Sequence, residues 1–205
     1  THMIKVVSPA GTAVWPKLNE PDFRFDENGV YSVQLRMKKD ECSELVEKLT
    51  AFHQQVHAAF SEDKGKKLKT ADLPFKMVED DEGKETGEVE FKFKLKAKTK
   101  TRSGEVYEKS PKIFDATGTP MNGEDIIGAG STIKVASNVR GWYMPALGVG
   151  ISLQIGAVQV IDLQRYEGGG GKTAQSWGFS KEEGFETVAP ADAPTSGSDA
   201  ADFDF

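Results

Sequence analysis

The sequence predicts an all-β protein, mainly antiparallel, with one inserted α-helix. Three observations support this prediction: several segments alternate apolar and polar residues, one long stretch has helical periodicity, and glycine-rich turns separate the strands. Helices do not alternate with strands, which disfavours a parallel α/β sheet. We therefore expect a small barrel built mostly from neighbouring strands.

The first sixty residues contain two strand candidates and the helix. Residues 4–7 form a short apolar strand, and residues 8–29 are rich in Pro, Gly, Asn and Asp, so we expect them to be mostly loop. Residues 31–37 alternate as a half-buried strand. Residues 41–60 carry apolar side chains at steps of three and four, and Asp40 is a plausible N-cap.

Beyond the helix, apolar and polar residues alternate with a period of two, as in β-strands. Residues 61–88 are mostly polar, and we expect a turn at 79–83. Alternation then begins at Val89 and leads to a hairpin turn at Ser103-Gly104. The remaining strand candidates are 113–115, 132–139 and 149–163, the last with a face switch beside Gly156 that indicates a β-bulge. Among small barrels the five-stranded OB-fold suits this pattern, although a β-sandwich stays an alternative.

The charge is unevenly distributed along the 205 residues, whose formal net charge is −6. Residues 166–205 contain two lysines and eight acids, so residues 1–165 carry 24 charges of each sign. We expect an OB-fold domain over residues 4–166. Residues 167–205 should form a Gly-rich linker and a disordered acidic C-terminal tail, because they have too few apolar side chains to offset the entropy of ordering. Thr1-His2-Met3 resembles a cloning remnant.

Several functional classes find no support in the sequence. The single cysteine, Cys42, excludes an internal disulfide framework and Cys-based zinc patterns, and we expect it to be buried. His53 and His57 lie four apart on the helix without a third ligand, so packing or surface roles are expected and no metal. Gly171-Lys172-Thr173 lacks the first glycine of a P-loop. We expect no cofactor, no catalytic residues, no membrane span and a soluble intracellular protein.

A ladder of lysines follows Val89 and carries the strongest functional signal. In one extended strand these side chains would project from a single face, about 6.7 Å apart. The members are Lys92, Lys94, Lys96, Lys98 and Lys100, followed by Arg102. Such a face binds phosphate backbones independently of base sequence and weakens with salt. The alternative is an edge strand protected from aggregation, for which one or two lysines suffice.

Two adjacent aromatic residues mark a second candidate. Trp142 and Tyr143 lie in a Gly-Pro-bounded segment beginning at Arg140, which we expect to be a loop between strands. An exposed aromatic ring there could stack on any nucleobase. The alternative is that Trp142 or Tyr143 closes the end of the barrel.

The C-terminus alternates acids with phenylalanines, at Asp199, Asp202, Phe203, Asp204 and Phe205. A charged peptide with two apolar anchors suits docking into a basic, apolar-floored pocket on a partner. It also suits weak occupation of the chain's own lysine face. A purely solubilising tail would explain the acids but not the phenylalanines.

The chain resembles the single-stranded DNA-binding proteins of podoviruses, short-tailed phages that encode their own replisome. The matching stretches are 17–37, the helix around His53, 73–75, 90–98, 125–135, 148–171 and the acidic end at Phe205. The resemblance implies an OB-fold homodimer that coats single-stranded DNA in the cytoplasm of the infected bacterium. It further implies roles in replication, recombination, repair and annealing, and an acidic tail contacting the phage polymerase and helicase-primase.

Carried over by position, Lys92 and Lys94 would be groove cations, and Trp142 or Tyr143 the stacking platform. This chain has Lys96 where the family has an aromatic residue, which implies a more salt-sensitive complex. The alternative within this class is an annealing factor used mainly in recombination. A nuclease-like enzyme using the acidic loop and a structural phage protein are alternatives from other classes.

Overall fold

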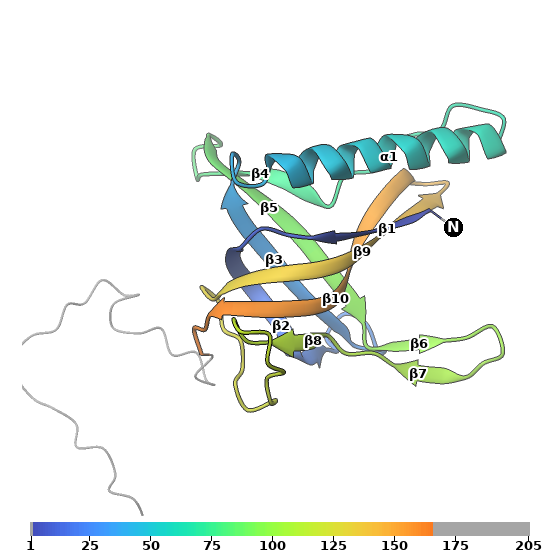
Figure 1. Cartoon of the computed structure of the whole chain (residues 1–205). Coiled ribbons are helices and arrows are strands. Elements are labelled where there is room, and N and C mark those ends of the chain that lie inside the picture. The colour runs from blue at the N-terminus through green and yellow to red at the C-terminus, as the bar shows by residue number, and fades with distance from the viewer. Residues whose placement is uncertain (1, 166–205) are drawn as a thin grey trace, which may run out of the picture. The chain divides into compact units, whose positions relative to one another are not determined.

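The structure, a computed structural model, describes residues 2–165. Ten strands and one helix make up this part of the chain (Figure 1). In chain order they are β1 Met3–Val7, β2 Gly11–Asp22, β3 Val30–Lys38, α1 Ser43–Asp63, β4 Phe75–Glu79, β5 Glu85–Lys96, β6 Lys98–Lys100, β7 Val106–Glu108, β8 Lys112–Phe114, β9 Thr132–Met144 and β10 Gly148–Asp162. The predicted linker and acidic tail, 167–205, lie outside the described residues.

Five strands close into a barrel. β9 pairs with β2, β2 with β3, β3 with β5, β5 with β10, and β10 returns to pair with β9. The β5–β10 pair is parallel, at Phe93–Lys94 against Leu153–Gln154, and β8 also runs parallel to β10. The sheet is therefore mixed, while every other pairing in the barrel is antiparallel. The predicted OB-fold barrel is confirmed.

Strands β3 and β5 show why the barrel keeps one register. Val33 lies opposite Phe93 and Leu35 opposite Phe91, and all four side chains are buried in the core. Because side chains alternate along a strand, the positions between them, including Lys92, face outward. A slip by one residue would bring charged side chains into the core, so the alternation fixes the register.

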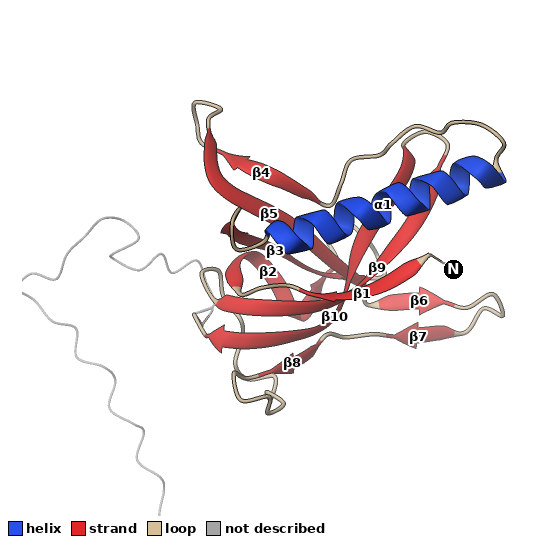
Figure 2. Ribbon diagram, turned by 45° about the horizontal axis from the view of Figure 1, so that its top comes forward, coloured by secondary structure: helices blue, strands red, loops and turns tan. Residues whose placement is uncertain are grey.

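The helix α1 lies across the barrel (Figure 2). Leu45, Leu49, Phe52 and Val56 are buried, as the helical periodicity predicts. The predicted N-cap is wrong, however, because residues 38–42 form a turn and the helix begins only at Ser43, without a side-chain cap.

Two histidines and one cysteine of this region are packing residues. Nε2 of the buried His53 lies 2.9 Å from the carbonyl oxygen of Val149, and Nε2 of His57 lies 2.9 Å from that of Leu68. These contacts tie the helix to β10 and to the segment that follows the helix. Cys42 is fully buried, which confirms its expected role and raises the pKa of its thiol.

Strand β2 corrects the prediction that residues 8–29 are mostly loop. It pairs with β3, but the pairing shifts register between Val14 and Lys17 and again between Lys17 and Asp22. Pro16 and Pro21 fall within these irregular segments, where no regular ladder is required of them. The turn-like composition therefore belongs to an interrupted strand.

Two further strands depart from prediction. Strand β4, which pairs with β5, was not expected, although the turn between them was. Strand β9 continues to Met144, so the segment from Arg140 is not a loop. A Cβ added to Gly141 would lie 2.5 Å from Val56 Cγ1, so this glycine accommodates the close approach of α1. In addition, Met3 pairs with Arg140, so the presumed cloning remnant takes part in β1.

Other local predictions are confirmed. Strand β10 has a register shift between Ile155 and Ala157, beside Gly156. The hairpin of β6 and β7 forms, and its turn is one residue longer than expected, with Gly104 at a φ of 89°. Within residues 2–165, the helix does not combine the length and apolar character needed to cross a bilayer.

Candidate nucleic-acid interface

The described fold has a face on which OB-folds bind extended ligands. That face is formed by the second and third barrel strands and bordered by the loops between strands one and two and between strands four and five. Here the corresponding strands are β3 and β5, and the loops are 23–29 and 145–147. The lysines of β5 project outward from this face.

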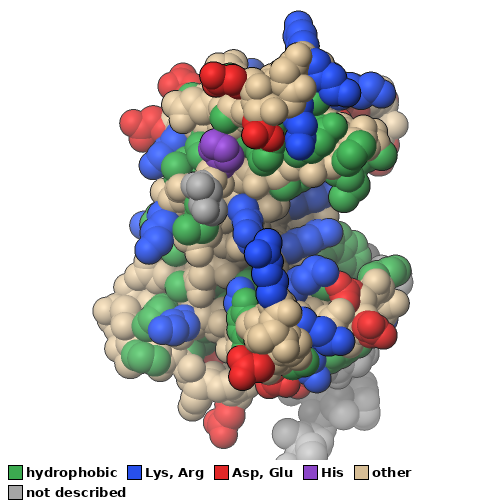
Figure 3. Space-filling model, turned by 90° about the vertical axis from the view of Figure 1, so that its right-hand side faces the viewer, with side chains coloured by type: hydrophobic (Ala, Val, Ile, Leu, Met, Phe, Trp, Pro, Cys, Tyr) green, Lys and Arg blue, Asp and Glu red, His purple; other side chains and the backbone are tan. Residues whose placement is uncertain are grey.

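A groove of about 530 Å³ lies at this face, between β5, β9, β10, the 23–29 loop and the β6–β7 ribbon. Cationic and aromatic side chains line it, and we call it the basic groove. Those that carry the argument are Phe25, Lys94, Lys96, Tyr107, Lys109 and Arg140. Figure 3 shows Lys and Arg side chains gathered in the recessed middle of one face of the molecule.

Both aromatic residues of the basic groove have a cation over the ring. Phe25 is 91% exposed, and the guanidinium of Arg24 lies 5.6 Å from its ring centroid. Tyr107 is 41% exposed, with Nζ of Lys109 at 5.0 Å. The sequence prediction did not include either aromatic residue in the site, because contacts between segments far apart in the sequence bring them to one groove. An available signal was the Phe23-Arg24-Phe25 run between two strands.

Within residues 2–165, some lysines of the ladder form ion pairs with carboxylates and others do not. Lys96 lies 3.5 Å from a carboxylate oxygen of Asp26, and Lys98 lies 3.7 Å from one of Glu108. Among residues 2–165, no carboxylate lies within 4.0 Å of the remaining candidate cations. These are Lys92, Lys94, Lys100, Arg102 and Arg140. The free positive charge of the face is therefore centred on the exposed Lys92 and Lys94.

The ladder does not form one continuous strand, which corrects the sequence prediction. Strand β5 ends at Lys96, and the buried Ala97 separates it from β6. The Ala97 amide donates to the carbonyl of Gly29, and its own carbonyl accepts from the Lys109 amide. Lys98 and Lys100 consequently belong to the projecting β6–β7 ribbon, and Arg102 lies in its turn.

The predicted aromatic pair divides between two environments. Tyr143 packs near Phe60 of α1, with ring centroids 6.1 Å apart, and joins the hydrophobic core. Trp142 is half-buried and lies over Gly150, where an added Cβ would collide with its indole ring. Of the predicted site residues in this segment, Arg140 lines the basic groove. The roles of Trp142 and Tyr143 in binding stay predictions.

The 23–29 loop that presents Phe25 is held by two carboxylates. Asp22 makes a bidentate ion pair with Arg24, with a shortest distance of 2.7 Å, and this hydrogen bonding lowers the pKa of Asp22 to about 2. Asp26 accepts hydrogen bonds from the backbone and side chain of Asn28, which, with nearby Lys96, lower the pKa of Asp26. Both carboxylates favour one ordered loop conformation when ionised.

A family model described as "Single-stranded DNA-binding protein, Bacteriophage T7" matches residues 10–163. The chain belongs to this family. Membership confirms the resemblance inferred from the sequence, and also the expectation of a binding protein rather than an enzyme, since the family is non-enzymatic.

Comparisons with individual proteins agree with the assignment. The chain is 28% identical over 204 residues to the single-stranded DNA-binding protein of Enterobacteria phage T3, covering 89% of this chain and 84% of the relative. The crystal structure of the bacteriophage T7 protein superposes with a TM-score of 0.69 at 26% identity, covering 91% of this chain and all of that one. The bacteriophage Enc34 protein, at 17% identity and a TM-score of 0.55, shares the fold over 86% of this chain and 90% of its own.

We expect the Asp26 carboxyl to titrate below its ordinary pKa of 3.8. Because the pKa is lowered in the folded state, the stability contributed by Asp26 is present above pH 3.8 and is lost as pH falls through the folded value. Carboxyl-detected NMR titration measures this pKa directly. Asn28→Ala and Lys96→Ala should each raise it only part of the way, because each removes a side-chain contribution while the largest one, the hydrogen bond from the Asn28 backbone amide, stays. An unshifted wild-type pKa would contradict this account of the loop.

Proposed function

We propose that this protein binds and protects single-stranded DNA without sequence preference, through the basic groove. The observation that carries the proposal is the meeting, in one groove on the OB face, of exposed aromatic rings with cations such as Lys94 and Arg140, which have no carboxylate partner among residues 2–165. Cations neutralise phosphates and release counterions, while aromatic rings stack on any base. The names of the T3 and T7 relatives, both single-stranded DNA-binding proteins, support it.

The chemistry of the groove favours unpaired bases over a duplex. A ring such as Phe25 can stack only on a base whose face is free, and in duplex DNA the base faces are occupied by neighbours. The decisive experiment is a titration with single- and double-stranded oligonucleotides of equal length at two salt concentrations. Tighter binding to the single strand, weakening steeply with salt, is the expected result, whereas equal affinity for the duplex would refute the proposal.

We further propose that the protein acts in phage DNA replication, recombination and repair, promotes annealing of complementary strands, and functions as a homodimer. The alternative is an annealing factor acting mainly in recombination. Measuring strand-annealing rates beside stimulation of a phage polymerase separates the two, because the alternative predicts annealing without stimulation.

Replacing both central lysines should flatten the salt dependence of DNA binding. The double substitution Lys92→Ala, Lys94→Ala removes two exposed cations that have no carboxylate partner among residues 2–165. The slope of log affinity against log salt should fall in magnitude by about 1.4, since each contact to a single strand contributes about 0.7. Fluorescence anisotropy with labelled oligo(dT) measures it. The control, Lys66→Ala with Lys67→Ala after the helix, should leave the slope unchanged. An unchanged slope in the test variant would exclude these lysines from the site.

Removing the exposed ring of Phe25 should weaken binding without altering the salt slope. Phe25→Ala should cost about 1–3 kcal/mol of binding free energy, since stacking releases no counterions. The melting temperature should stay within a degree or two of wild type, because the ring is 91% exposed. Ile126→Ala, which trims an exposed apolar side chain outside the groove, is the control. Full affinity in Phe25→Ala would contradict the stacking role.

We propose that the acidic tail recruits the phage polymerase and helicase-primase through its alternating Asp and Phe residues. Seven acids and two lysines follow Gly171, so truncation there removes net negative charge that competes with DNA for cations. The truncated chain should lose partner binding in pull-downs with purified proteins and should bind oligo(dT) more tightly. Phe203→Ala with Phe205→Ala, which keeps the charge, separates the apolar anchors from the acids. Partner binding retained after truncation would contradict the recruitment role.

A further inference from the structure

Trp15 on β2 has a backbone conformation that its side chain disfavours. Its φ is 50°, and it is the one residue other than glycine with a positive φ in the part of the chain described here. This region is strained for a bulky side chain. Pro16 follows directly, and a residue before proline prefers extended conformations. Such a conformation persists when the surrounding structure imposes it, and it occurs most often at functional sites.

The strain lies at a β-bulge that turns the indole outward. Val14 pairs with Gln34 and Lys17 with Ser32, so β2 advances three residues while β3 advances two. Glycine commonly occupies a left-handed position of this kind. Here a tryptophan occupies it, and its side chain is 77% exposed. Core packing therefore does not account for the residue.

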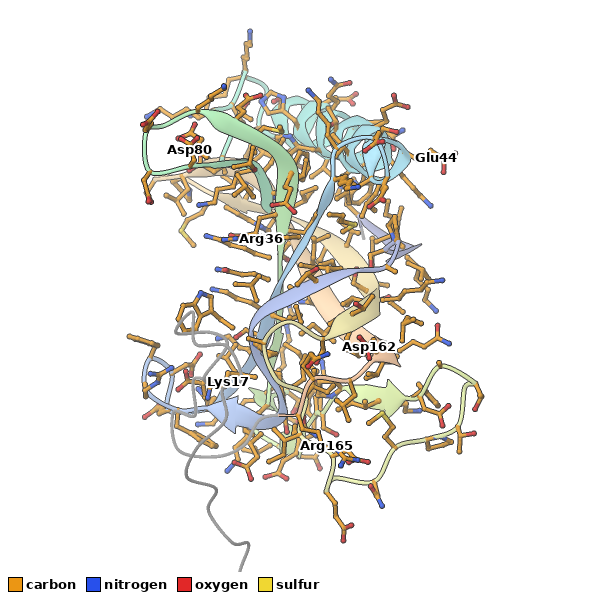
Figure 4. All side chains as sticks on the ribbon, turned by 90° about the vertical axis from the view of Figure 1, so that its left-hand side faces the viewer. Lys17, Arg36, Glu44, Asp80, Asp162 and Arg165 are labelled. Carbon is orange, nitrogen blue, oxygen red and sulfur yellow. The ribbon has the colours of Figure 1, made fainter. Side chains whose placement is uncertain are left out.

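The bulge lies one strand beyond Lys92 and Lys94, the two exposed lysines of the OB face that have no carboxylate partner among residues 2–165. Across the sheet, Lys17 pairs with Ser32 and Ser32 with Lys94, and in the next row Gln34 pairs with Lys92. Neighbouring strands lie about 4.8 Å apart, so β2 runs roughly 10 Å from β5. Figure 4 shows this side of the barrel, with Lys17 and Arg36 labelled.

We propose that Trp15 is a second base-stacking platform, which takes a nucleobase from the DNA strand after it crosses Lys92 and Lys94 and leaves the basic groove. Lys17, exposed on the same strand, would then face the adjoining phosphate. The proposal rests on the proposed function and extends it, because it assigns the path of the strand from the groove across β3 to β2.

The chemistry around Trp15 favours nucleic acid over a second copy of the chain. Its neighbours in the two rows include Lys17, Lys92 and Lys94, and no carboxylate of residues 2–165 lies within 4.0 Å of these ammonium groups. A symmetric dimer through this surface would bring like charges together, whereas a DNA strand supplies both a ring face and compensating phosphates.

Substitution by glycine and by phenylalanine tests the proposal with the full-length protein. Trp15→Gly removes the ring and suits the positive φ, so the melting temperature should hold or rise. Its affinity for oligo(dT) should fall by roughly five- to 140-fold, with an unchanged salt slope. Trp15→Phe keeps a stacking ring and should stay within about threefold of wild type. The quenching of tryptophan fluorescence by oligo(dT) should decrease more in Trp15→Phe than in Trp142→Phe.

Three outcomes would overturn the proposal. The first is full affinity and unchanged total quenching in Trp15→Gly. The second is a loss of affinity together with a lower melting temperature, which would make the residue structural. The third is a change in the sedimentation coefficient alone, which would mark an interface between copies. The control is Val7→Ser, which removes an exposed apolar side chain from β1. If wild-type protein itself binds no oligo(dT), the proposed function fails, and the wild-type titration alone reveals this.

Discussion

Closure of the barrel by β10 is the constraint on which the candidate site depends. This strand pairs with β9 along its length, and its Leu153 and Gln154 also pair in parallel with β5. Without that short parallel contact, the edge of β5 that faces away from β3 would be unpaired at Phe93 and Lys94, beyond the stretch that β4 covers. With it, side chains from β5, β9 and β10 line one groove, and Ser152 of β10 lies opposite Arg140 of β9. The fold thus gathers groups that are about sixty residues apart in the chain.

Local electrostatics then decide which cations can serve a ligand. Residues 1–165 have no net charge, so binding depends on the arrangement of charges and not on their sum. The Asp26–Lys96 ion pair connects the 23–29 loop to β5. The Arg36–Glu90 ion pair, at 2.7 Å, connects β3 to β5. Lys92 and Lys94 lie between these two pairs. Because the loop and the sheet are already ordered, a ligand loses less free energy in arranging them.

The parts of this fold that the sequence predicts are those where one periodicity continues without interruption. In α1, β3 and β5 the buried face repeats at 3.6 or 2.0 residues, and the prediction is correct to within a few residues. The ladder prediction failed at Ala97, because alternation continues in the sequence after the hydrogen-bonded partner changes. The groove aromatics, Phe25 and Tyr107, could not be paired from local patterns, because only long-range closure brings their loops together.

The irregularity of strand β2 explains why the sequence did not predict this strand, and it also shapes the proposed binding site. Its two register shifts made residues 11–22 look like loop, since an interrupted strand loses the strict alternation that identifies it. The same shifts turn Trp15 out of the ladder and allow the chain to enter the 23–29 loop that presents Phe25. Glycine at residue 15 would adopt the positive φ of the bulge without strain, but it would offer no ring near Lys92 and Lys94. Departures from local rules that lack a packing explanation are expected where a protein meets its ligand, and here the exposed rings of Trp15 and Phe25 lie within and just after the irregular strand β2.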